Sequence, residues 1–410
     1  MYTEQVTPPE IARQPGKHAG PTLYAAMGAL CLVAFLAPAL PLYVIRPFRA
    51  QDPTALAVAL SVRRWGPWIA PVAALASLPL ALAAWRASRR WTGRAAAAAT
   101  FALTLLFAVL AQINVYESLM FHAVDGLRFV AAAESKVLAD DMVLSVNIGG
   151  ETKAYPIRTI GYHHIVNDRV GGVDVAITYC TLCHTGLVWR RTVNGRTLTF
   201  HLGGINNQNA LLRDAETGSF WQQSTGIALS GPLKGTQLEL VPADELSFAE
   251  FRKETPNAVV MAAVPKDEAD YETADWDQRV RRYPTVVDTR ATGIEPRELM
   301  LGVVVDGASR AYPLKTVLEK KLIVDTVARA PIALAVATDG KSVRCFRAEP
   351  GQRLERDPQT GALLDAASKR EWSFEGCAAS GRPCLTRVAV YKDFWFNWRV
   401  DHPRTTVYGR

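Results

Sequence analysis

The sequence predicts an α+β chain in which three transmembrane α-helices precede a mostly β, duplicated, two-lobe extracytoplasmic domain. Three observations carry this prediction: long uncharged segments before residue 120, short β-rich segments after residue 142, and a block that recurs 157 residues further along the chain. The chain has 410 residues, of which 49% are hydrophobic and 21% charged. This length and composition allow two or three domains and exclude a disordered polyelectrolyte.

A membrane domain is expected over residues 1–120. It contains three uncharged segments, at about 22–45, 65–85 and 95–116, and each reaches the roughly 20 residues that a helix needs to cross a bilayer. Buried core helices of a soluble domain and a cleaved signal peptide are the alternatives. Three such segments in close succession favour an integral membrane protein over both.

The basic residues predict an orientation in that membrane. Residues 1–120 hold ten Lys and Arg against four Asp and Glu, so most of the net charge of +7 lies beside the apolar segments and no nucleic-acid partner is expected. Lys and Arg concentrate in cytoplasmic loops. Four arginines in the first loop oppose a cytoplasmic N-terminus, whereas six residues favour it: Arg13, Lys17, Arg86, Arg89, Arg90 and Arg94. We therefore expect a bacterial inner (cytoplasmic) membrane protein whose chain after Tyr116 is extracytoplasmic.

From Met142 onward the chain has the pattern of short strands separated by Gly, Asn and Asp. The dipeptide Asn194-Gly195 is typical of the type I′ turn of a β-hairpin. A short helix or an irregular crossing is expected between the first two strands, at 155–166. The predicted strands are 143–148, 173–179, 188–192 and 197–202.

The β-rich part contains an internal repeat. Residues 144–168 share with residues 301–325 the tripeptide Ala-Tyr-Pro and a later aspartate, which is Asp168 in the first copy and Asp325 in the second. Since both copies keep this aspartate, we expect it to be structural. Two lobes of one fold are the simplest account of such a repeat.

The two lobes are expected at residues 142–262 and 300–410, with a polar linker at 263–299. At the repeat offset of 157 residues, the histidines and cysteines of lobe one correspond to residues of lobe two that have neither an imidazole nor a thiol. The second lobe is therefore expected to be degenerate and structural. The corresponding pairs are His163 and Lys320, His164 and Lys321, Cys180 and Ala337, Cys183 and Gly340, and His184 and Lys341.

The strongest functional signal is Cys180-Thr-Leu-Cys183-His184, which lies between two predicted strands. Two cysteines at this spacing present both sulfurs from one tight turn. The first chemistry that fits is thiol–disulfide exchange, in which Cys180 and Cys183 act catalytically on a partner protein or a small thiol.

Two cofactor-based chemistries also fit. A copper or zinc centre for metal binding or trafficking would use Cys180, Cys183 and His163, with His164 as a further ligand. A c-type haem would attach to the same cysteines, because Cys180 to His184 matches C-x-x-C-H and His184 would bind the iron.

Other polar residues are candidates for supporting the cysteine turn. Trp221 is a candidate cofactor-binding residue that could wall the turn, although loop and turn chemistry explains its neighbours equally well. Cys377 and Cys384 either form a disulfide or remain two free thiols. The remaining candidates are Asn206, Asn207, Asn209, Gln222, Gln223 and His201.

Several motifs that occur in order resemble the DUF3179 family over roughly residues 142–410. The family's Tyr-Cys-x-Leu-Cys motif maps onto Tyr179, Cys180, Leu182 and Cys183, and its Trp-His-Glu-Ile-Val-Asn-Asp motif onto residues 162–168. This chain departs from the second motif with Tyr162 and His164, and its His184 stands where the family has another residue. Some members of the family are described as selenoproteins, so the resemblance implies redox chemistry rather than a structural metal site. It implies no established activity.

Overall fold

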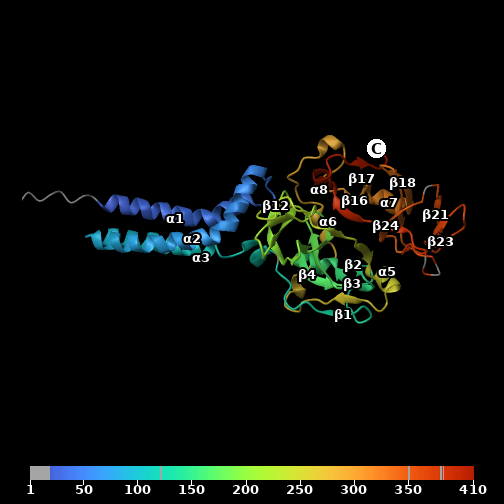
Figure 1. The fold of residues 1–410 in the computed structure, drawn as a ribbon, viewed down its shortest axis with the longest axis horizontal. Helices are drawn as coiled ribbons and strands as arrows, with labels where there is room; N and C mark the ends of the chain where they lie inside the picture. The colour runs from blue at the N-terminus through green and yellow to red at the C-terminus, as the bar shows by residue number, and fades with distance from the viewer. Residues whose placement is uncertain (1–18, 121, 350, 379–380, 382) are drawn as a thin grey trace, which may run out of the picture. The chain divides into compact units, whose positions relative to one another are not determined.

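The computed structural model describes residues 19–120, 122–349, 351–378, 381 and 383–410 (Figure 1). The chain divides into two compact units. We call the first the helical unit (Met1–Leu42 and Val62–Ile113) and the second the β unit (Tyr43–Ser61 and Asn114–Arg410). Each unit is described by itself.

Three helices have the length and apolar composition needed to cross a membrane: α1 (Ala19–Val44), α2 (Pro53–Ala87) and α3 (Trp91–Leu110). The prediction of three such helices is confirmed, but two bounds differ. Helix α2 begins earlier than expected and therefore includes Arg63 and Arg64, and α3 ends before residue 116.

The early start of α2 has a local cause. The Asp52 carboxylate accepts the backbone N–H groups of Thr54 and Ala55, both at 3.0 Å. Such a carboxylate satisfies N–H groups that have no partner within the first turn of a helix. Pro53 follows at the first helical position, where its missing N–H is not needed.

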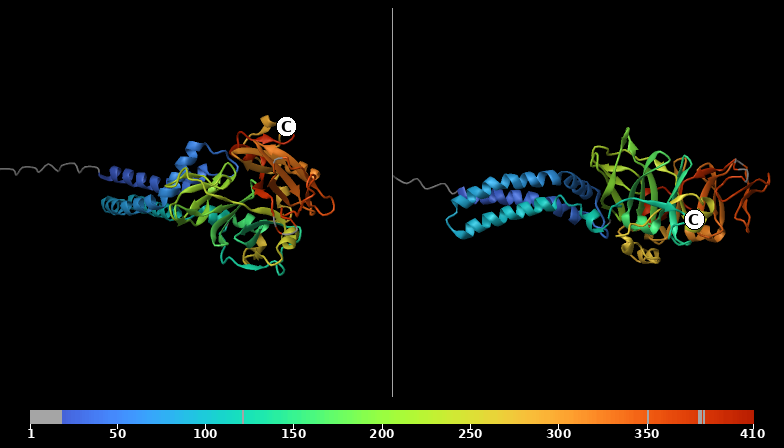
Figure 2. Two further views of the ribbon diagram at one scale, coloured as in Figure 1. Left: turned by 45° about the vertical axis from the view of Figure 1, so that its right-hand side comes forward. Right: turned by 90° about the horizontal axis from the view of Figure 1, so that it is seen from below.

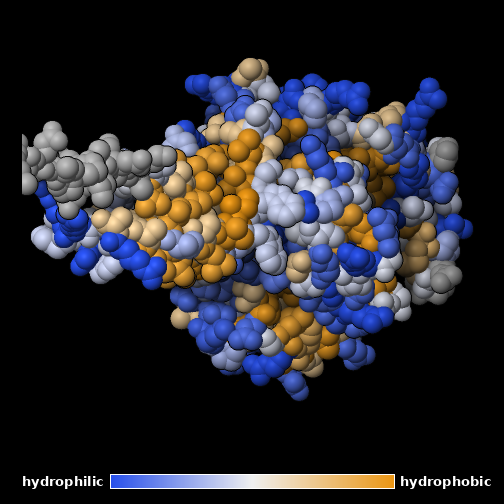
Figure 3. Space-filling model, turned by 60° about the vertical axis from the view of Figure 1, so that its left-hand side comes forward, coloured by the Kyte–Doolittle hydropathy of each residue, from blue (hydrophilic) through white to orange (hydrophobic). Residues whose placement is uncertain are grey.

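The helical unit has small residues inside and large apolar residues outside. Leu32, Trp68 and Leu75 are each more than half exposed, and Figure 3 shows the resulting apolar surface of the helices in orange. Small residues let helix backbones approach closely, as in membrane bundles. One buried cluster consists of Ala34, Ala37, Ala70, Ala73, Ala74 and Ala108.

The first β region of the β unit contains three larger sheets and one small hairpin. Their strand orders are β1-β15-β3-β2-β14, β12-β11-β10-β9 and β13-β6-β5-β4. The strands are β1 (Phe129–Ala131), β2 (Met142–Ile148), β3 (Glu151–Pro156), β4 (Ile165–Val170), β5 (Val173–Cys180), β6 (Thr185–Arg190), β9 (Phe200–Asn206), β10 (Asn209–Asp214), β11 (Phe220–Gln222), β12 (Ala228–Ser230), β13 (Leu240–Val241), β14 (Asp244–Ser247) and β15 (Val259–Met261). The hairpin pairs β7 (Thr192–Val193) with β8 (Arg196–Thr197). Its turn residues Asn194 and Gly195 have φ of 50° and 75°, as the expected type I′ turn requires.

The second β region contains the sheets β25-β16-β17-β26, β18-β19-β20-β24 and β21-β22-β23. Its strands are β16 (Leu299–Val305), β17 (Ala308–Pro313), β18 (Leu322–Val327), β19 (Ala330–Val336), β20 (Val343–Arg347), β21 (Leu354–Arg356), β22 (Leu363–Asp365), β23 (Glu371–Trp372), β24 (Thr386–Val388), β25 (Val390–Phe394) and β26 (Thr406–Val407). The short α-helices of the β unit are α4 (Ile157–His163), α5 (Phe248–Glu254), α6 (Trp276–Val280), α7 (Leu314–Lys320) and α8 (Trp395–Asp401).

The two β regions share part of their connectivity. The order β15-β3-β2-β14 corresponds to β26-β17-β16-β25, and in each case the outer pair, β15 with β3 and β26 with β17, is parallel. In the first region the Tyr155 hydroxyl donates to Asp168 at 2.6 Å, and in the second Tyr312 donates to Asp325 at 2.9 Å. The tyrosine and aspartate that both sequence blocks keep therefore form the same structural hydrogen bond.

The two β regions lie side by side and pack against each other, as both views of Figure 2 show in green and in orange to red. Leu299, Phe394 and Phe396 from the second region belong to the main hydrophobic core of the first. The Lys392 ammonium pairs with the Glu245 carboxylate at 2.6 Å across this boundary. The β unit is therefore built from both regions.

The segment Tyr43–Ser61 between the first two long helices also belongs to the β unit. Ile45, Leu56 and Leu60 are buried in the main core of that unit. This segment lies within the 1–120 range that the sequence assigned to a membrane domain. The residues of that range are thus divided between both units.

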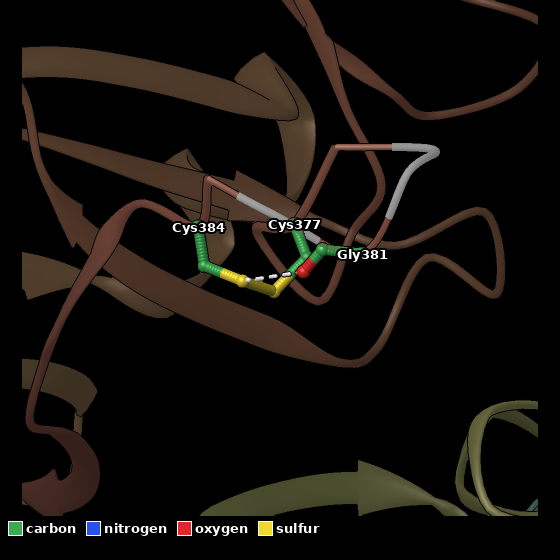
Figure 4. The surroundings of a disulfide bond; sticks show 3 residues. All are labelled: Cys377, Gly381 and Cys384. Atoms are coloured by element: carbon green, nitrogen blue, oxygen red, sulfur yellow. Dashed lines mark hydrogen bonds between the residues drawn. A yellow bond between two sulfur atoms is a disulfide. The ribbon is translucent and has the colours of Figure 1, made fainter.

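Cys377 and Cys384 form a disulfide that closes a short loop (Figure 4). The backbones of the two residues also form an antiparallel β-bridge, and the Cys384 Sγ lies 3.3 Å from the carbonyl oxygen of Gly381. The structure therefore has the bonded form of the two that the sequence allowed.

Candidate functional site

Cys180 and Cys183 occupy the tight connection between two paired strands. Strand β5 ends at Cys180 and β6 begins at Thr185, and the Cys183 backbone N–H donates to the Cys180 carbonyl at 3.2 Å. His184 completes the turn with φ of 60°, in the left-handed region. Only 2% of Cys180 and none of Cys183 is exposed. The turn therefore directs both thiols into the protein.

A single backbone group covers both sulfurs. The carbonyl oxygen of Gln208 lies 3.5 Å from the Cys180 Sγ and 3.4 Å from the Cys183 Sγ. Gln208 follows Asn207 in the turn between β9 and β10, and the φ values of these two residues are 73° and 45°. A left-handed backbone conformation at two adjacent non-glycine residues costs free energy, so it persists only where the surrounding structure stabilises it.

The surroundings do hold this turn on both sides. The Gln51 backbone N–H donates to the Asn207 side chain at 2.9 Å, and the Asn207 backbone N–H donates to the Gln51 side chain at 2.5 Å. The Gln208 side-chain amide donates to the Pro284 carbonyl at 2.9 Å and accepts from the Val286 N–H at 3.2 Å. The cover over the cysteines is therefore fixed from two distant parts of the sequence.

The two thiols have opposite pKa shifts. Burial raises the pKa of Cys183 well above its ordinary value, and the neighbouring Cys180 adds to this rise. Burial also opposes ionisation of Cys180, but its pKa is lowered because the Cys183 thiol and the backbone N–H groups of Ala210, Cys183 and Leu182 stabilise its thiolate. Within this pair, the surroundings therefore favour ionisation of Cys180 over ionisation of Cys183.

A network of side-chain amides lies next to the pair. The Asn209 amide donates to the Cys183 Sγ at 3.4 Å and to the Gln223 side chain at 3.0 Å. Gln222 donates in turn to the Asn209 Oδ1 at 2.7 Å, and Asn206 donates to the Gln222 side chain at 2.9 Å. Four of the polar candidates from the sequence therefore form one chain of hydrogen bonds that ends at a cysteine sulfur.

The second β region and the linker also contribute to the site, which the sequence did not predict. The Phe394 backbone N–H donates to the Cys183 carbonyl at 2.8 Å, and the Arg297 guanidinium donates to the Leu182 carbonyl at 2.7 Å. The Asp393 carboxylate accepts from the Thr185 hydroxyl at 2.8 Å. A lone acidic residue directly before the aromatic run from Phe394 to Phe396 is the one sequence signal that could have marked Asp393 as buried.

Asp393 is a buried carboxyl group near the thiols. Burial raises its pKa well above the ordinary value, although Asn397 and Thr185 donate hydrogen bonds to it. Charge interactions between Asp393 and the cysteines also raise the pKa values on both sides. Burial therefore disfavours the charged form of the Asp393 carboxyl group beside the thiols.

His184 is directed toward the linker. Its Nδ1 lies 3.1 Å from the Tyr179 hydroxyl and its Nε2 lies 3.1 Å from the Asp277 carboxylate. Its ring stacks on Trp276 with 4.8 Å between the ring centroids. Both ring nitrogens are thus engaged and both sulfurs are buried, so these residues do not fit a covalent haem with His184 as an iron ligand.

His163 and His164 end helix α4 with different surroundings. The His163 Nδ1 lies 2.7 Å from the His122 carbonyl and its Nε2 lies 3.2 Å from the Tyr271 hydroxyl. Burial lowers the pKa of His164 to about 3. Within the described ranges, His, Cys, Asp and Glu form no group of three or more that could hold a metal ion. The metal site expected from Cys180, Cys183 and these histidines is therefore not assembled among those residues.

Two further candidates face other partners. The Trp221 Nε1–H donates to the Asp214 carboxylate at 2.8 Å, and the indole ring packs edge-on against Phe200. The His201 Nδ1 lies 2.9 Å from the Glu117 carboxylate. Trp221 therefore supports the fold of sheet β12-β11-β10-β9, whereas its neighbours Gln222 and Gln223 reach the cysteine site.

Taken together, these features define a chain with helices long enough to span a membrane and a β unit that holds a buried dithiol. Residues 121–405 match the family model described as "Protein of unknown function (DUF3179)". The match covers more than half of the chain, and the protein belongs to this family. Searches of curated proteins and of solved structures found no match.

Proposed function

We propose that this protein is a membrane-anchored thiol–disulfide oxidoreductase whose Cys180 and Cys183 exchange disulfides with a partner protein or a small thiol. The observation that carries the proposal is the pair of free thiols in one turn, both against the Gln208 carbonyl, and the lowered pKa of Cys180 beside the raised pKa of Cys183 agrees with it. A nucleophile with a lowered pKa beside a second, protonated thiol is the arrangement that disulfide exchange requires.

The reaction takes two balanced steps. The Cys180 thiolate attacks one sulfur of a substrate disulfide, a mixed disulfide forms, and the first substrate sulfur leaves as a thiolate that takes up a proton. Cys183 then loses its proton and attacks the Cys180 Sγ, which releases the second substrate thiol. The protein dithiol is oxidised to a disulfide, and one substrate disulfide is reduced to two thiols.

Access to Cys180 requires movement of the cover. Because the Gln208 carbonyl lies against both sulfurs, a substrate can approach only when the turn at Asn207 and Gln208 moves away. The positive φ values of that turn favour such a movement once its hydrogen bonds to Gln51 and Pro284 open.

We also propose that the β unit is extracytoplasmic in a bacterial inner membrane. The disulfide between Cys377 and Cys384 supports this location, because such bonds persist in oxidising compartments. The arginines of the loop between α2 and α3 support it as well. Arg13 and Lys17, which contributed to the predicted orientation, lie outside the described residues.

A duplication origin for the two β regions is part of this proposal. The matching strand orders, the two parallel outer pairs and the repeated hydrogen bond between a tyrosine and an aspartate support it. In this account the second copy has lost the cysteines and now supplies Asp393 and Phe394 to the site of the first.

Trapping experiments test the proposed redox function. In full-length protein expressed in a bacterial membrane, Cys183→Ser is expected to accumulate a mixed disulfide at Cys180, because the resolving thiol is missing. Cys180→Ser is expected to trap nothing. Cys345→Ser is the matched control, because burial raises the pKa of that thiol to about 12 and it lies far along the chain from the pair.

Intact mass after acid quenching and gel shift with and without reductant measure these adducts. The proposal would be overturned if the Cys183→Ser variant carried no adduct and if dithiothreitol could not convert the wild-type Cys180–Cys183 pair between its disulfide and dithiol forms. A stoichiometric metal adduct lost in Cys180→Ser would instead support metal binding.

A further inference from the structure

We propose that a pocket beside the cysteine cover binds a small disulfide that carries a primary ammonium group. This inference rests on the proposed redox function and names the class of substrate for it. The pocket has a volume of about 270 Å³. That is below the usual range for drug-sized ligands, so its occupant is a small molecule rather than a folded partner.

Amide groups and one carboxylate form the polar wall of this pocket, and Phe396 and Val287 are part of its apolar wall. An apolar body with a few placed polar groups is the usual composition of a small-molecule site. The polar lining residues are Asn206, Asn207, Gln222, Thr225, Asn397 and Asp401.

The pocket is connected to the thiols in two ways. Asn207 lines it and is followed directly by Gln208, whose carbonyl covers both sulfurs. Gln222 also lines it and is joined through Asn209 to the Cys183 Sγ by hydrogen bonds of 2.7 and 3.4 Å. A ligand in this pocket would therefore lie against the segment that must move to expose Cys180.

The preference for an ammonium group comes from Asp401. It is the charged residue among those that line the pocket, and the Asn397 amide donates to its Oδ2 at 3.3 Å. Burial raises the pKa of Asp401 to about 6, although the neighbouring Ser224 and Asn397 side chains oppose the rise. At neutral pH the carboxylate is thus mainly ionised in a partly desolvated place, where a cation stabilises it most.

The substrate that combines these features has an ammonium group for Asp401, an apolar chain for Phe396 and a disulfide within reach of Cys180. Its reaction balances as one protein dithiol and one disulfide giving one protein disulfide and two aminothiols. An external dithiol would reduce the protein again for another cycle.

The test compares three disulfides of similar length: cystamine, which is cationic, bis(2-hydroxyethyl) disulfide, which is neutral, and 3,3′-dithiodipropionate, which is anionic. Reduced full-length protein in detergent is mixed with each, quenched in acid, and the peptide that contains Cys180 and Cys183 is scored by mass for oxidation. Each rate is divided by the rate of the same disulfide with N-acetylcysteine amide, which removes differences in intrinsic reactivity.

Cystamine is expected to react about tenfold faster than the neutral disulfide after this correction, and the anion slower than both. Asp401→Asn is expected to remove the preference, whereas Asp125→Asn, which neutralises an exposed carboxylate paired with Lys266, keeps it. In the wild type the preference is expected to shrink as the pH falls from about 7.5 to about 5, because Asp401 takes up a proton. This second measurement does not depend on the folding of any variant.

Equal corrected rates for the three disulfides, or a cystamine preference that survives both Asp401→Asn and acidification, would overturn the pocket assignment while the redox function stands. A pair that none of the three disulfides oxidises and that dithiothreitol cannot reduce would overturn the redox function itself. The two failures are therefore distinguishable.

Discussion

Cys180 and Cys183 lie three positions apart, yet their thiols have different neighbours. Cys180 ends a strand beside backbone N–H groups, whereas the Cys183 sulfur accepts from the side-chain amide of Asn209, and the carbonyl of Gln208 lies against both sulfurs. The sequence predicted the pair from its spacing alone. It did not predict the Gln208 cover, because that contact depends on how sheet β12-β11-β10-β9 lies against the cysteine turn.

His184 shows the same limit of local reasoning. The motif C-x-x-C-H matched a haem site by spacing, but tertiary structure places Tyr179 and Asp277 at the two ring nitrogens. Asp277 comes from the linker, nearly a hundred residues away. The C-x-x-C-H motif therefore identified residues that share one turn, but it did not identify the residues that contact His184 in the folded chain.

The acid dependence of stability tests the contact between His184 and Asp277. Burial opposes ionisation of Asp277, but His184 and Arg281 lower its pKa to about 2. In an unfolded chain that pKa is about 3.9. The folded chain thus binds fewer protons between these values, so the contribution is complete above about pH 4 and is lost as the pH falls through about 2. Because 35% of the Asp277 side chain is exposed, screening limits it to about 1 kcal/mol.

Urea unfolding of the full chain in detergent, followed by tryptophan fluorescence between about pH 2 and 5, measures this contribution. We expect Asp277→Asn to unfold with a shallower pH dependence than the wild type. Asp140→Asn, which removes an exposed carboxylate paired with Lys341, should follow the wild-type curve. Parallel curves for Asp277→Asn and the wild type would contradict the prediction.

At the scale of elements, local patterns were sufficient for segments whose partners are adjacent in sequence. The hairpin at Asn194-Gly195 and the strands β2 and β5 lie within a few residues of where their patterns placed them. The start of α2 was missed because its apolar pattern begins after Arg63 and Arg64, whereas the helix begins at the Asp52 cap. Period and composition identify a helix better than they identify its first turn.

Local sequence patterns did not predict the contacts between elements of the two β regions. Arg344 on β20 has only 5% of its side chain exposed and pairs with Glu254 and Asp244 from the first region. In sequence, Arg344 lies 100 positions from Asp244 and 90 positions from Glu254. The hydrophobic periodicity of the two segments does not predict that Arg344 pairs with Glu254 and Asp244.

Removal of Arg344 tests how strongly this contact joins the regions. Arg344→Met is expected to lower the free energy of unfolding of the β unit by about 3–5 kcal/mol, because the Glu254 carboxylate, with 8% of its side chain exposed, loses its cation, whereas Asp244 keeps its pair with Arg387. Arg347→Met is the matched control on the same strand. Its pair with Asp306 is 40% exposed on the arginine side, so a loss below about 1 kcal/mol is expected.

Urea unfolding at neutral pH compares both variants with the wild type. A loss for Arg344→Met that is no larger than the loss for Arg347→Met would show that the contact contributes little. Unfolding of the variant in two separate transitions would show that the regions are joined mainly through this pair.

At the scale of the whole molecule, the sequence predicted three long apolar helices and a β-rich part, and the structure has both. The side of the membrane on which the β unit lies determines the redox environment of its thiols. The bond between Cys377 and Cys384 is of the kind that persists in oxidising compartments.

Fusions at the C-terminus test the orientation. Alkaline phosphatase fused after Arg410 is expected to be active, and GFP at the same place is expected to be dark. In the same cells, Cys377 and Cys384 are expected to resist a thiol-reactive label until a reductant is added, because they form a disulfide. Cys377→Ser, which leaves Cys384 without its disulfide partner, is the control for labelling without reductant. A fluorescent GFP fusion with an inactive phosphatase would refute the orientation.

The reciprocal hydrogen bonds between Gln51 and Asn207 have a practical consequence. Ile45, Leu56 and Leu60 accompany Gln51 into the hydrophobic core of the β unit, although the family match begins only at residue 121. A shortened chain that starts at residue 121 would expose the core positions that these side chains fill. It would also leave the turn over Cys180 without one of its two anchors, so thiol reactivity measured on such a fragment would overstate that of the intact protein.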